Sequence, residues 1–520
     1  MSNLNNEAHN QNMKCSEVCE RPDFESELFK DIYSDAELII GLVGAVGTDL
    51  DEISKILKNR LKAYSYDTEE IRVSKDIIKE SIDIEDYNDE FGRISSYMNG
   101  GNRIRKESRY NSALALGIAS KLHQLRKQNG NESEPFKKKA IIINSLKHPD
   151  EVQRLRQIYS IGFYLIGVYK QDRLRKQFLI ENLKMNDSQA DEIMARDSDE
   201  SEPFGQHTRD TFHLSDFFVN CDKANSIKLQ NDIWRFLDLI FGNPYITPTF
   251  DEYAMFMAFS ASLRSADLSR QVGAVIALNK NIIATGANDV PCAGGGLYWP
   301  CYDKEEAKII DIENGRDYKR GIDSNASEKQ SLIENILSKL PIIPKNQYDK
   351  YRCRLEGSNI DDITEYGRIV HAEMEAILSC ARSQSGIKDA ELYCTTYPCH
   401  NCAKHIIAAG IKRVIYVEPY PKSKAMKFHY DSISNNQGDS PKVIFEPFVG
   451  VGPRSFFNLF SMRMGIGYYL KRKNKYGKII NWQESDGRLR MQLLPHSYLE
   501  REVRIVSEFK TILERLNEEK

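Results

Sequence analysis

Two short motifs constrain this chain more than any other feature of its sequence. His371-Ala372-Glu373 and Pro398-Cys399-His400-Asn401-Cys402 each stand at the start of a helical pattern, with a predicted helix and strand between them. Cys399 and Cys402 are three residues apart, so both sulfurs point the same way in the first turn of a helix and can bind one ion. Helix N-termini favour anions, which helps to hold both side chains as thiolates. The fold is therefore expected to bring His371 to this pair of cysteines.

The number of protein ligands indicates the kind of metal site. A tetrahedral Zn2+ ion held by His371, Cys399 and Cys402 keeps its fourth position for water, which distinguishes a catalytic zinc from a closed structural one. Zinc lowers the pKa of that water toward about 7. Glu373 follows the histidine by two residues and is predicted to transfer protons without binding the ion. The order H-x-E and then P-C-x-x-C is the signature of zinc-dependent deaminases, which predicts an enzyme.

Length and composition limit the remaining possibilities. A chain of 520 residues is too long for one ordinary hydrophobic core, so two or three domains are expected. Apolar residues make up 41% and charged residues 28%, which excludes bulk disorder, and the net charge of −3 gives no overall attraction to nucleic acid or anionic membranes. No apolar run reaches the roughly 18 residues of a membrane span, and the polar start lacks the core of a signal peptide. We expect a cytoplasmic protein with no membrane partner, whose cysteines are thiols.

The hydrophobic pattern predicts an α/β protein with four segments. Residues 1–35 are polar and read as a flexible N-terminal segment. Strands and helices alternate over 36–245, which predicts a mainly parallel sheet covered on both faces. A second α/β domain is expected over 246–470, with an insertion at about 294–368 beside the active site, because so long a connection is usually functional or independently structured. Residues 471–520 form a C-terminal extension.

A glycine-rich turn follows the first predicted strand. Gly41, Gly44, Gly47 and Thr48 resemble the phosphate loop of nucleoside and nucleotide kinases, but no lysine precedes Thr48, and Asp49 adds a negative charge. Backbone amides at a helix start can bind phosphate without a lysine. We therefore predict a degenerate P-loop kinase-like domain that takes a nucleotide at these four residues and has no phosphoryl-transfer activity.

Residues 250 to 417 resemble the dCMP deaminase family of the cytidine deaminase superfamily. The resemblance rests on Arg270–Ile276, Ala284–Asn288 and Thr395–Cys399, together with the zinc motifs. It implies a five-stranded α/β deaminase fold, a homo-oligomer, and a deoxycytidine nucleotide as substrate. It further implies that Asn288 hydrogen-bonds the sugar and that Ala372 and Thr396 border the base. For Asn288 the alternative is an ordinary turn asparagine.

Nearly the whole chain resembles the bacterial antiphage cytidine nucleotide deaminases. The resemblance includes Arg196-Asp197, Gly205–Asp210 and Gly295–Trp299. It implies depletion of the dCTP and dCMP pools during infection. The first domain would then be a sensor or a repressing partner that takes a regulatory nucleotide, and an inhibitory small RNA is a further possible partner.

Two other functions stay open at this point. A nucleic-acid base deaminase would use a basic channel and stacking aromatics, for which the tail around Lys471 to Lys478 is the candidate. A nucleotide- or RNA-binding switch would carry a vestigial deaminase domain. The overall charge opposes the first alternative, and the intact His371, Glu373, Cys399 and Cys402 oppose the second.

Overall fold

The computed structural model describes most of the chain after residue 35. The described residues are 36–130, 134–198, 200, 204–222, 226–340, 344–355, 358, 360, 363, 365–420, 422–436, 438–439, 441–463, 468–492 and 495–518. All of them belong to the unit Ser34–Lys520. The predicted N-terminal segment 1–35 lies outside them. No helix among the described residues is long and apolar enough to cross a membrane.

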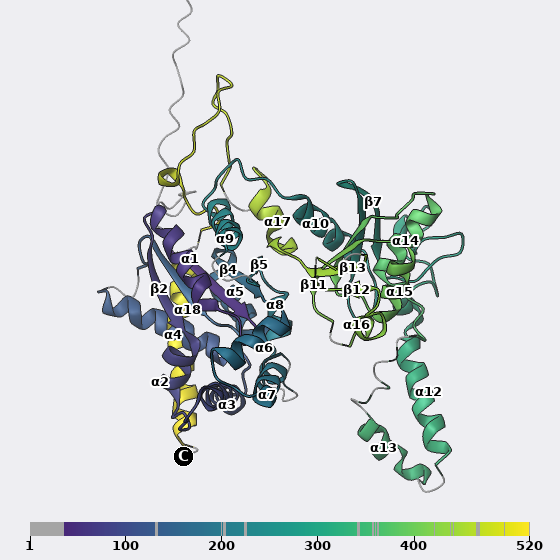
Figure 1. Cartoon of the computed structure of the whole chain (residues 1–520), viewed down its shortest axis with the longest axis horizontal. Coiled ribbons are helices and arrows are strands. Elements are labelled where there is room, and N and C mark those ends of the chain that lie inside the picture. Colours follow the sequence, from purple (N-terminus) through teal and green to yellow (C-terminus); the bar gives the residue numbers. More distant parts are fainter. Residues whose placement is uncertain are drawn as a thin grey trace, which may run out of the picture. The chain divides into compact units, whose positions relative to one another are not determined.

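The first sheet is built around a strand with no exposed residue. In β1 (Leu38–Gly44) every position is buried, because the apolar run Leu38–Val43 needs cover on both faces of the sheet. The sheet order is β14-β5-β4-β1-β3-β2. Figure 1 labels β2, β4 and β5 of this sheet. The strands β2 to β5 pair in parallel with their neighbours or with β1, as predicted. Their bounds are β2 (Asp67–Arg72), β3 (Lys139–Asn144), β4 (Phe163–Tyr169) and β5 (Phe217–Asn220).

Helices connect these strands and cover both faces of the sheet. The glycine turn after β1 leads into α1 (Leu50–Ala63), whose N-terminus is capped by Asp49 through a hydrogen bond from the Glu52 amide. The other helices of this region are α2 (Lys79–Ser81), α3 (Glu90–Ser108), α4 (Ala113–Gln128), α5 (Pro149–Tyr159), α6 (Asp172–Glu181), α7 (Asp187–Ser198), α8 (Thr208–Phe212) and α9 (Ile227–Ile240).

The second sheet carries the zinc motifs. Its order is β12-β13-β11-β10-β6-β7, where β6 and β7 form an antiparallel hairpin and β10, β11 and β13 run parallel (Figure 1). Five of these strands form the sheet expected from the resemblance, and the two-residue β12 extends its edge. The bounds are β6 (Gly273–Leu278), β7 (Asn281–Ala287), β10 (Glu391–Thr396), β11 (Arg413–Glu418), β12 (Ile433–Ser434) and β13 (Val443–Pro447).

Successive side chains of β6 point to opposite faces of this sheet. Val275 and Ala277 pack against α10 (Phe250–Ser262), whereas Ala274 and Ile276 face the core that contains α14 (Ala372–Arg382) and α15 (His400–Ala408). A strand with period two therefore builds a helix-sheet-helix sandwich. The predicted α/β class is confirmed for this region.

The long connection between β7 and α14 has secondary structure of its own. It contains the hairpin β8 (Cys301–Asp303) and β9 (Lys308–Ile310), followed by α11 (Asp317–Arg320), α12 (Ser324–Ser338) and α13 (Tyr348–Leu355). Arg316, whose side chain is buried, ties the connection to the domain because it pairs with Asp289 at 3.4 Å.

The end of the chain returns to the first sheet, which differs from the predicted segment boundary at 470. β14 (Gly450–Val451) pairs antiparallel with β5, and the short α17 (Pro453–Phe460) follows it. The last helix, α18 (Pro495–Glu518), places Phe509 and Ile512 in the core of the first domain, and Glu502 forms a fully buried ion pair with Arg126 at 2.9 Å. The predicted extension 471–520 thus contributes to the first domain, because the apolar face of α18 is buried only there.

Candidate active site

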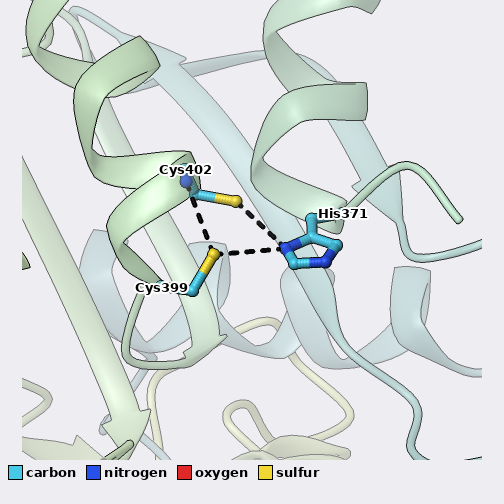
Figure 2. Close-up of side chains that lie close together, drawn as sticks. All are labelled: His371, Cys399 and Cys402. Carbon is cyan, nitrogen blue, oxygen red and sulfur yellow. Dashed lines mark hydrogen bonds between the residues drawn. The ribbon is translucent and has the colours of Figure 1, made fainter. Parts of the chain in front are cut away.

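The three predicted metal ligands come together at the N-termini of two helices. The Nδ1 atom of His371 lies 3.4 Å from the Sγ atom of Cys399 and 3.4 Å from the Sγ atom of Cys402 (Figure 2). All three ligand atoms lie within 4.8 Å of one another. Two sulfurs and a ring nitrogen bound tetrahedrally to one zinc ion would be separated by about 3.5 Å for each S–N pair. The donor set and its spacing therefore fit zinc.

Local sequence places these ligands at the helix ends. His371 is the N-cap residue of α14, and Cys399 is the N-cap residue of α15, where its sulfur accepts a hydrogen bond from the Cys402 amide at 3.4 Å. The helix α14 approaches the sheet closely because β7 carries a glycine at the contact. A Cβ atom on Gly286 would lie 2.1 Å from the carbonyl oxygen of Ala372. The glycine of β7 thus allows α14, and with it His371, to reach the cysteines.

The ligands stabilise a thiolate. Hydrogen bonding from Cys402 and His371, together with the charge of His371, lowers the pKa of Cys399 to about 4. The same hydrogen bond to Cys399 raises the pKa of His371 to about 9. The pKa of Cys402 is raised, first by its hydrogen bond to Cys399 and then by burial, so the two cysteines share one proton. A metal cation in this position would displace that proton.

Glu373 lies in the first turn of α14, beside the ligands and 4% exposed. Burial raises its pKa, although the nearby His371 opposes the shift. A raised pKa suits a carboxyl group that must both accept and donate a proton near neutral pH. Glu373 is not part of the ligand cluster.

His371, Cys399 and Glu373 line one cavity of about 460 Å³. Its wall includes the three residues that sequence reasoning assigned to the substrate, which are Asn288, Ala372 and Thr396. Ala372 is fully buried, and the Thr396 hydroxyl donates a hydrogen bond to Glu418 at 3.2 Å. A volume of this size is typical of small-molecule sites.

The amide of Asn288 is engaged by the protein itself. Its Oδ1 atom accepts a hydrogen bond from the Val272 amide at 2.7 Å, while Nδ2 donates to Asp267 at 3.0 Å and to the Arg270 carbonyl at 2.8 Å. Both hydrogens of the amide are therefore used, and Oδ1 keeps one lone pair. In this arrangement Asn288 positions residues 267–272, which form one wall of the cavity, and its predicted contact with the sugar stays a prediction.

Sequence reasoning missed several residues of the cavity wall. Asp317, Asp323 and Asn325 come from the insertion, and Arg270 and Lys422 are the cations of the wall. None of the first three belongs to a motif. The only feature of the sequence that indicated them was the length of the insertion, which placed it beside the active site. Arg270 is the first residue of the segment Arg270–Ile276, on which the family resemblance rests. Its positive charge alone could have identified it as a candidate phosphate ligand.

His400 and His405, which lie close to the cysteines in sequence, do not join them. His400 packs edge-on against Phe428 and lies 3.8 Å from Glu365. His405 is exposed. Neither is part of the ligand cluster among the described residues.

The glycine turn of the first domain is closed by an internal carboxylate. The Val46 amide donates a hydrogen bond to Asp197 at 2.8 Å, and Lys147 donates to the other oxygen of Asp197, also at 2.8 Å. Asp197 is fully buried. A carboxylate thus binds one backbone amide of the glycine turn, at Val46, which is not one of the four residues predicted to take a nucleotide.

The four residues predicted to bind a nucleotide have different surroundings. Gly41 lies inside β1, and a Cβ atom there would lie 2.9 Å from Leu146 and Phe163. Gly44 ends the strand, and Gly47 has a φ of +84°, which requires glycine where Arg175 approaches. The buried Thr48 hydroxyl has no hydrogen-bond partner among the described residues. Nucleotide binding at these positions stays a prediction.

Comparison with known proteins agrees with the geometry of the zinc motifs. The family model for the cytidine and deoxycytidylate deaminase zinc-binding region matches residues 248–418. The deoxycytidylate deaminase of Enterobacteria phage T4 is 31% identical over 182 residues, which cover 35% of this chain and 83% of the phage protein. The chain belongs to the deoxycytidylate deaminase family. Its predicted dCMP deaminase-type zinc domain is thereby confirmed.

Other relatives are more distant. Human deoxycytidylate deaminase is 27% identical over 169 residues, covering 32% of this chain and 63% of the human protein. The dCMP deaminase of cyanophage S-TIM5, solved in complex with dCMP and dUMP, is 20% identical with a TM-score of 0.23 and covers 39% of this chain and 100% of its own. Residues before 248 and after 418 lie outside the match to the family model.

Proposed function

We propose that this protein hydrolyses the exocyclic amine of cytosine deoxynucleotides, converting dCMP or dCTP into dUMP or dUTP and ammonia. The observation that carries the proposal is a zinc-type cluster of His371, Cys399 and Cys402. Two of these ligands, His371 and Cys399, line a single cavity together with the buried Glu373. Membership of the deoxycytidylate deaminase family supports the choice of substrate.

The residues of the site fit a hydrolytic deamination. Zinc, when bound, supplies a water molecule that is acidic near neutral pH. Glu373 takes the proton of this water and delivers it to N3 of the cytosine ring, while the water oxygen bonds to C4. Glu373 then takes the remaining proton from the hydroxyl on C4 and passes it to the amine, the C4–N bond breaks, and ammonia leaves a uracil product with a carbonyl at C4. Burial raises the pKa of Glu373, which favours a carboxyl group that must both accept and donate a proton.

The cavity wall suggests how a nucleotide is held. Arg270 and Lys422 supply positive charge at the wall and are our candidates for contacts with the phosphates. Ala372 and Thr396 border the base, and Asn288 contacts the sugar through its remaining acceptor capacity or through the loop that it positions.

The wider role that we propose is depletion of deoxycytidine nucleotides in the cytoplasm during phage infection, by a homo-oligomer. The resemblance to antiphage deaminases described above supports this role. The same resemblance supports the degenerate first domain as the place where a regulatory nucleotide or an inhibitory small RNA acts. Measuring dCTP in infected cells with and without the protein tests the role, and an unchanged dCTP pool would contradict it.

Substrate tests separate this proposal from its alternatives. The purified full-length protein is incubated with dCMP, dCTP and a cytosine-containing single-stranded oligonucleotide, and uracil products are measured. We expect product from the free nucleotides. Product from the oligonucleotide alone would show a nucleic-acid base deaminase, and no product from any substrate would favour a binding switch.

A substitution at Glu373 tests the assigned chemistry. Glu373→Gln should lower kcat by about 10²–10⁴-fold, because a positioned general acid-base contributes about that much. Zinc content should stay at the wild-type value. Glu375→Gln is the matched control, since Glu375 lies on the same helix but pairs with Arg382. Loss of zinc in Glu373→Gln would contradict the assignment.

A further inference from the structure

An antiparallel bridge joins the segment before α14 to the segment after β7. Val370 directly precedes His371, and its backbone pairs with Asp289. The Val370 amide donates a hydrogen bond to the Asp289 carbonyl at 3.0 Å, and the Asp289 amide donates to the Val370 carbonyl at 3.3 Å. This pair, which we name the ligand bridge, lies outside the strands of the sheet. Its geometry therefore depends on the side chains around it.

Arg316 of the insertion holds the Asp289 side of the ligand bridge. Its side chain is buried, and its Nε atom lies 3.4 Å from Oδ2 of Asp289. Neither of these two atoms has a hydrogen-bond partner among the described residues, and Asp289 is only 1% exposed. A buried carboxylate has lost its hydration and needs a charge partner. Asp289 therefore depends on Arg316 to compensate its charge.

The guanidinium of Arg316 is fixed from within the insertion as well. Its Nη1 atom lies 3.1 Å from Asp311, and its Nη2 atom donates a hydrogen bond to the Tyr298 carbonyl. A planar guanidinium can make these contacts together with the pair to Asp289, whereas a lysine ammonium presents a single point charge. Arg316 thus joins the insertion to the ligand bridge in a way that only arginine allows.

The next residue, Asp317, holds the Val370 side. Its Oδ1 atom accepts a hydrogen bond from Nη1 of Arg368 at 2.7 Å, and Nη2 of Arg368 donates to the Gly315 carbonyl at 3.0 Å. The Asp317 side chain is 7% exposed. Arg368 precedes Val370 by two residues and His371 by three. Two consecutive residues of the insertion therefore contact both segments of the ligand bridge.

The same segments line the catalytic cavity. Asn288, Asp317 and Ile369 are all part of its wall. Asn288 belongs to the segment after β7, and Ile369 to the segment before α14. Residues that hold the ligands of a metal in place typically contribute about 10–100-fold to metal affinity or activity. A displaced ligand bridge would move the cavity wall and His371 together.

We propose that Arg316 and Asp317, which we name the insertion clamp, are positioning residues of the deaminase site. They hold the ligand bridge in place and thereby set the position of His371. The insertion is then a required part of the site and not an appendage to it. The kinetic part of this inference rests on the proposed deaminase function. The order of the ligand bridge and the retention of zinc do not.

Hydrogen exchange tests the insertion clamp directly. Exchange of backbone amides is measured by mass spectrometry on the full-length wild type, Arg316→Lys and Arg368→Gln, in peptides that cover residues 286–292 and 366–374. We expect exchange at the ligand bridge to become about tenfold or more faster in both variants, because each loses an ion pair that holds the bridge. Unchanged exchange in both variants would overturn the proposal.

The variants are chosen so that folding does not obscure the result. Arg368 is 25% exposed, so Arg368→Gln covers the case in which Arg316→Lys fails to fold. Arg352→Gln is the matched control, since Arg352 pairs with Glu334 inside the insertion at 3.2 Å. It should leave exchange in both peptides at the wild-type rate. Faster exchange at the ligand bridge in this control would show a general loosening of the insertion and would overturn the specific role of the clamp.

Zinc retention and kinetics measure the consequence for the site. Transfer of zinc from the loaded protein to a chelator should be about tenfold or more faster in Arg316→Lys and Arg368→Gln, and kcat for dCMP in excess zinc should fall by about tenfold or more. Arg368→Lys should retain more activity than Arg368→Gln, because an ammonium can still pair with Asp317. Zinc loss at the wild-type rate in both variants would overturn the role toward His371.

A double-mutant cycle separates positioning from direct contact with the substrate. Because Asp317 acts through Arg368, Asp317→Asn should lower kcat in the wild type but change it by less than about twofold in the Arg368→Gln protein. A higher KM for dCMP in both backgrounds, with unchanged zinc retention, would show that Asp317 binds the substrate and would overturn its positioning role. Wild-type protein that forms no uracil product would count against the proposed function, while hydrogen exchange and zinc retention would still decide the clamp.

Discussion

Asn288→Asp is the sharpest test of how the catalytic cavity is held together. The substitution keeps the oxygen that accepts from the Val272 amide but replaces the donor Nδ2 by a second acceptor. That acceptor would face the Asp267 carboxylate, now 3.0 Å from Nδ2, and the Arg270 carbonyl, now 2.8 Å away. Two hydrogen bonds become two repulsive contacts without any change in side-chain size.

The magnitude follows from these contacts. The bond to the charged Asp267 contributes about 1.5–3 kcal/mol, and the bond to the carbonyl about 1 kcal/mol. Repulsion between two carboxylates about 4 Å apart adds up to about 4 kcal/mol at an effective dielectric constant of 20, and partial exposure of Asp267 reduces it. We expect the free energy that holds residues 267–272 in the observed conformation to fall by about 3–5 kcal/mol. Because these residues form one wall of the catalytic cavity, kcat/KM should fall by about 10²-fold or more.

The assay compares kcat/KM and zinc content with those of the wild type. Zinc should be retained, because no ligand is touched. Lowering the pH should shrink the defect relative to wild type, since one proton on the carboxylate pair removes the repulsion. Asn281→Asp is the matched control at an exposed position of the same hairpin, where the amide only donates to the Asn279 carbonyl. A kcat/KM within about threefold of wild type would refute the reasoning.

Three further outcomes are expected. Glu252→Gln should lower the free energy of unfolding by about 2–4 kcal/mol, because the fully buried Glu252 carboxylate pairs with Arg235 at 2.8 Å; an unchanged denaturation midpoint would contradict this. Burial raises the pKa of Asp251, but its hydrogen bond to Arg413 and the charge of that residue lower it overall. The stability that Asp251 contributes is therefore present above its ordinary pKa and lost as the pH falls through the lowered value. Asp251→Asn should cost about 1–2 kcal/mol at pH 7 and progressively less as the pH falls through the lowered pKa of Asp251, as thermal melts would show, and a constant difference would argue against the ion pair. Chelation should abolish deamination and leave Cys399 reactive to thiol reagents, with activity restored by Zn2+ and not by Mg2+; full activity in metal-free protein would exclude the assigned centre.

Much of the zinc domain could be predicted because its information is local. The spacing of Cys399 and Cys402 within one helical turn and the position of Glu373 two residues after His371 fix which side chains can face one ion. The structure places these residues at helix N-termini, as the pattern indicated. The alternation of strands and helices likewise predicted the parallel first sheet.

Sequence reasoning did not predict where the end of the chain packs, because its contacts are with residues far away in the sequence. α18 completes the first domain although more than 350 residues separate Glu502 from Arg126, with which it pairs. A helix with one apolar face shows in sequence that it needs a partner but not which one. The pairing of β14 with β5 had no signal at all, since two residues carry no period.

The amino-acid sequence by itself determined which residues could supply the proposed chemistry, namely the proposed ligands, the proposed proton carrier and the α/β elements that present them, because each depends on spacings of a few residues. Only the tertiary structure decided what surrounds that chemistry. It placed Asp197 on the glycine turn, brought Asp317 and Asn325 of the insertion to the catalytic cavity, and paired Arg316 with Asp289. These contacts arise from burial and charge pairing between distant segments, which leave no periodic trace along the chain.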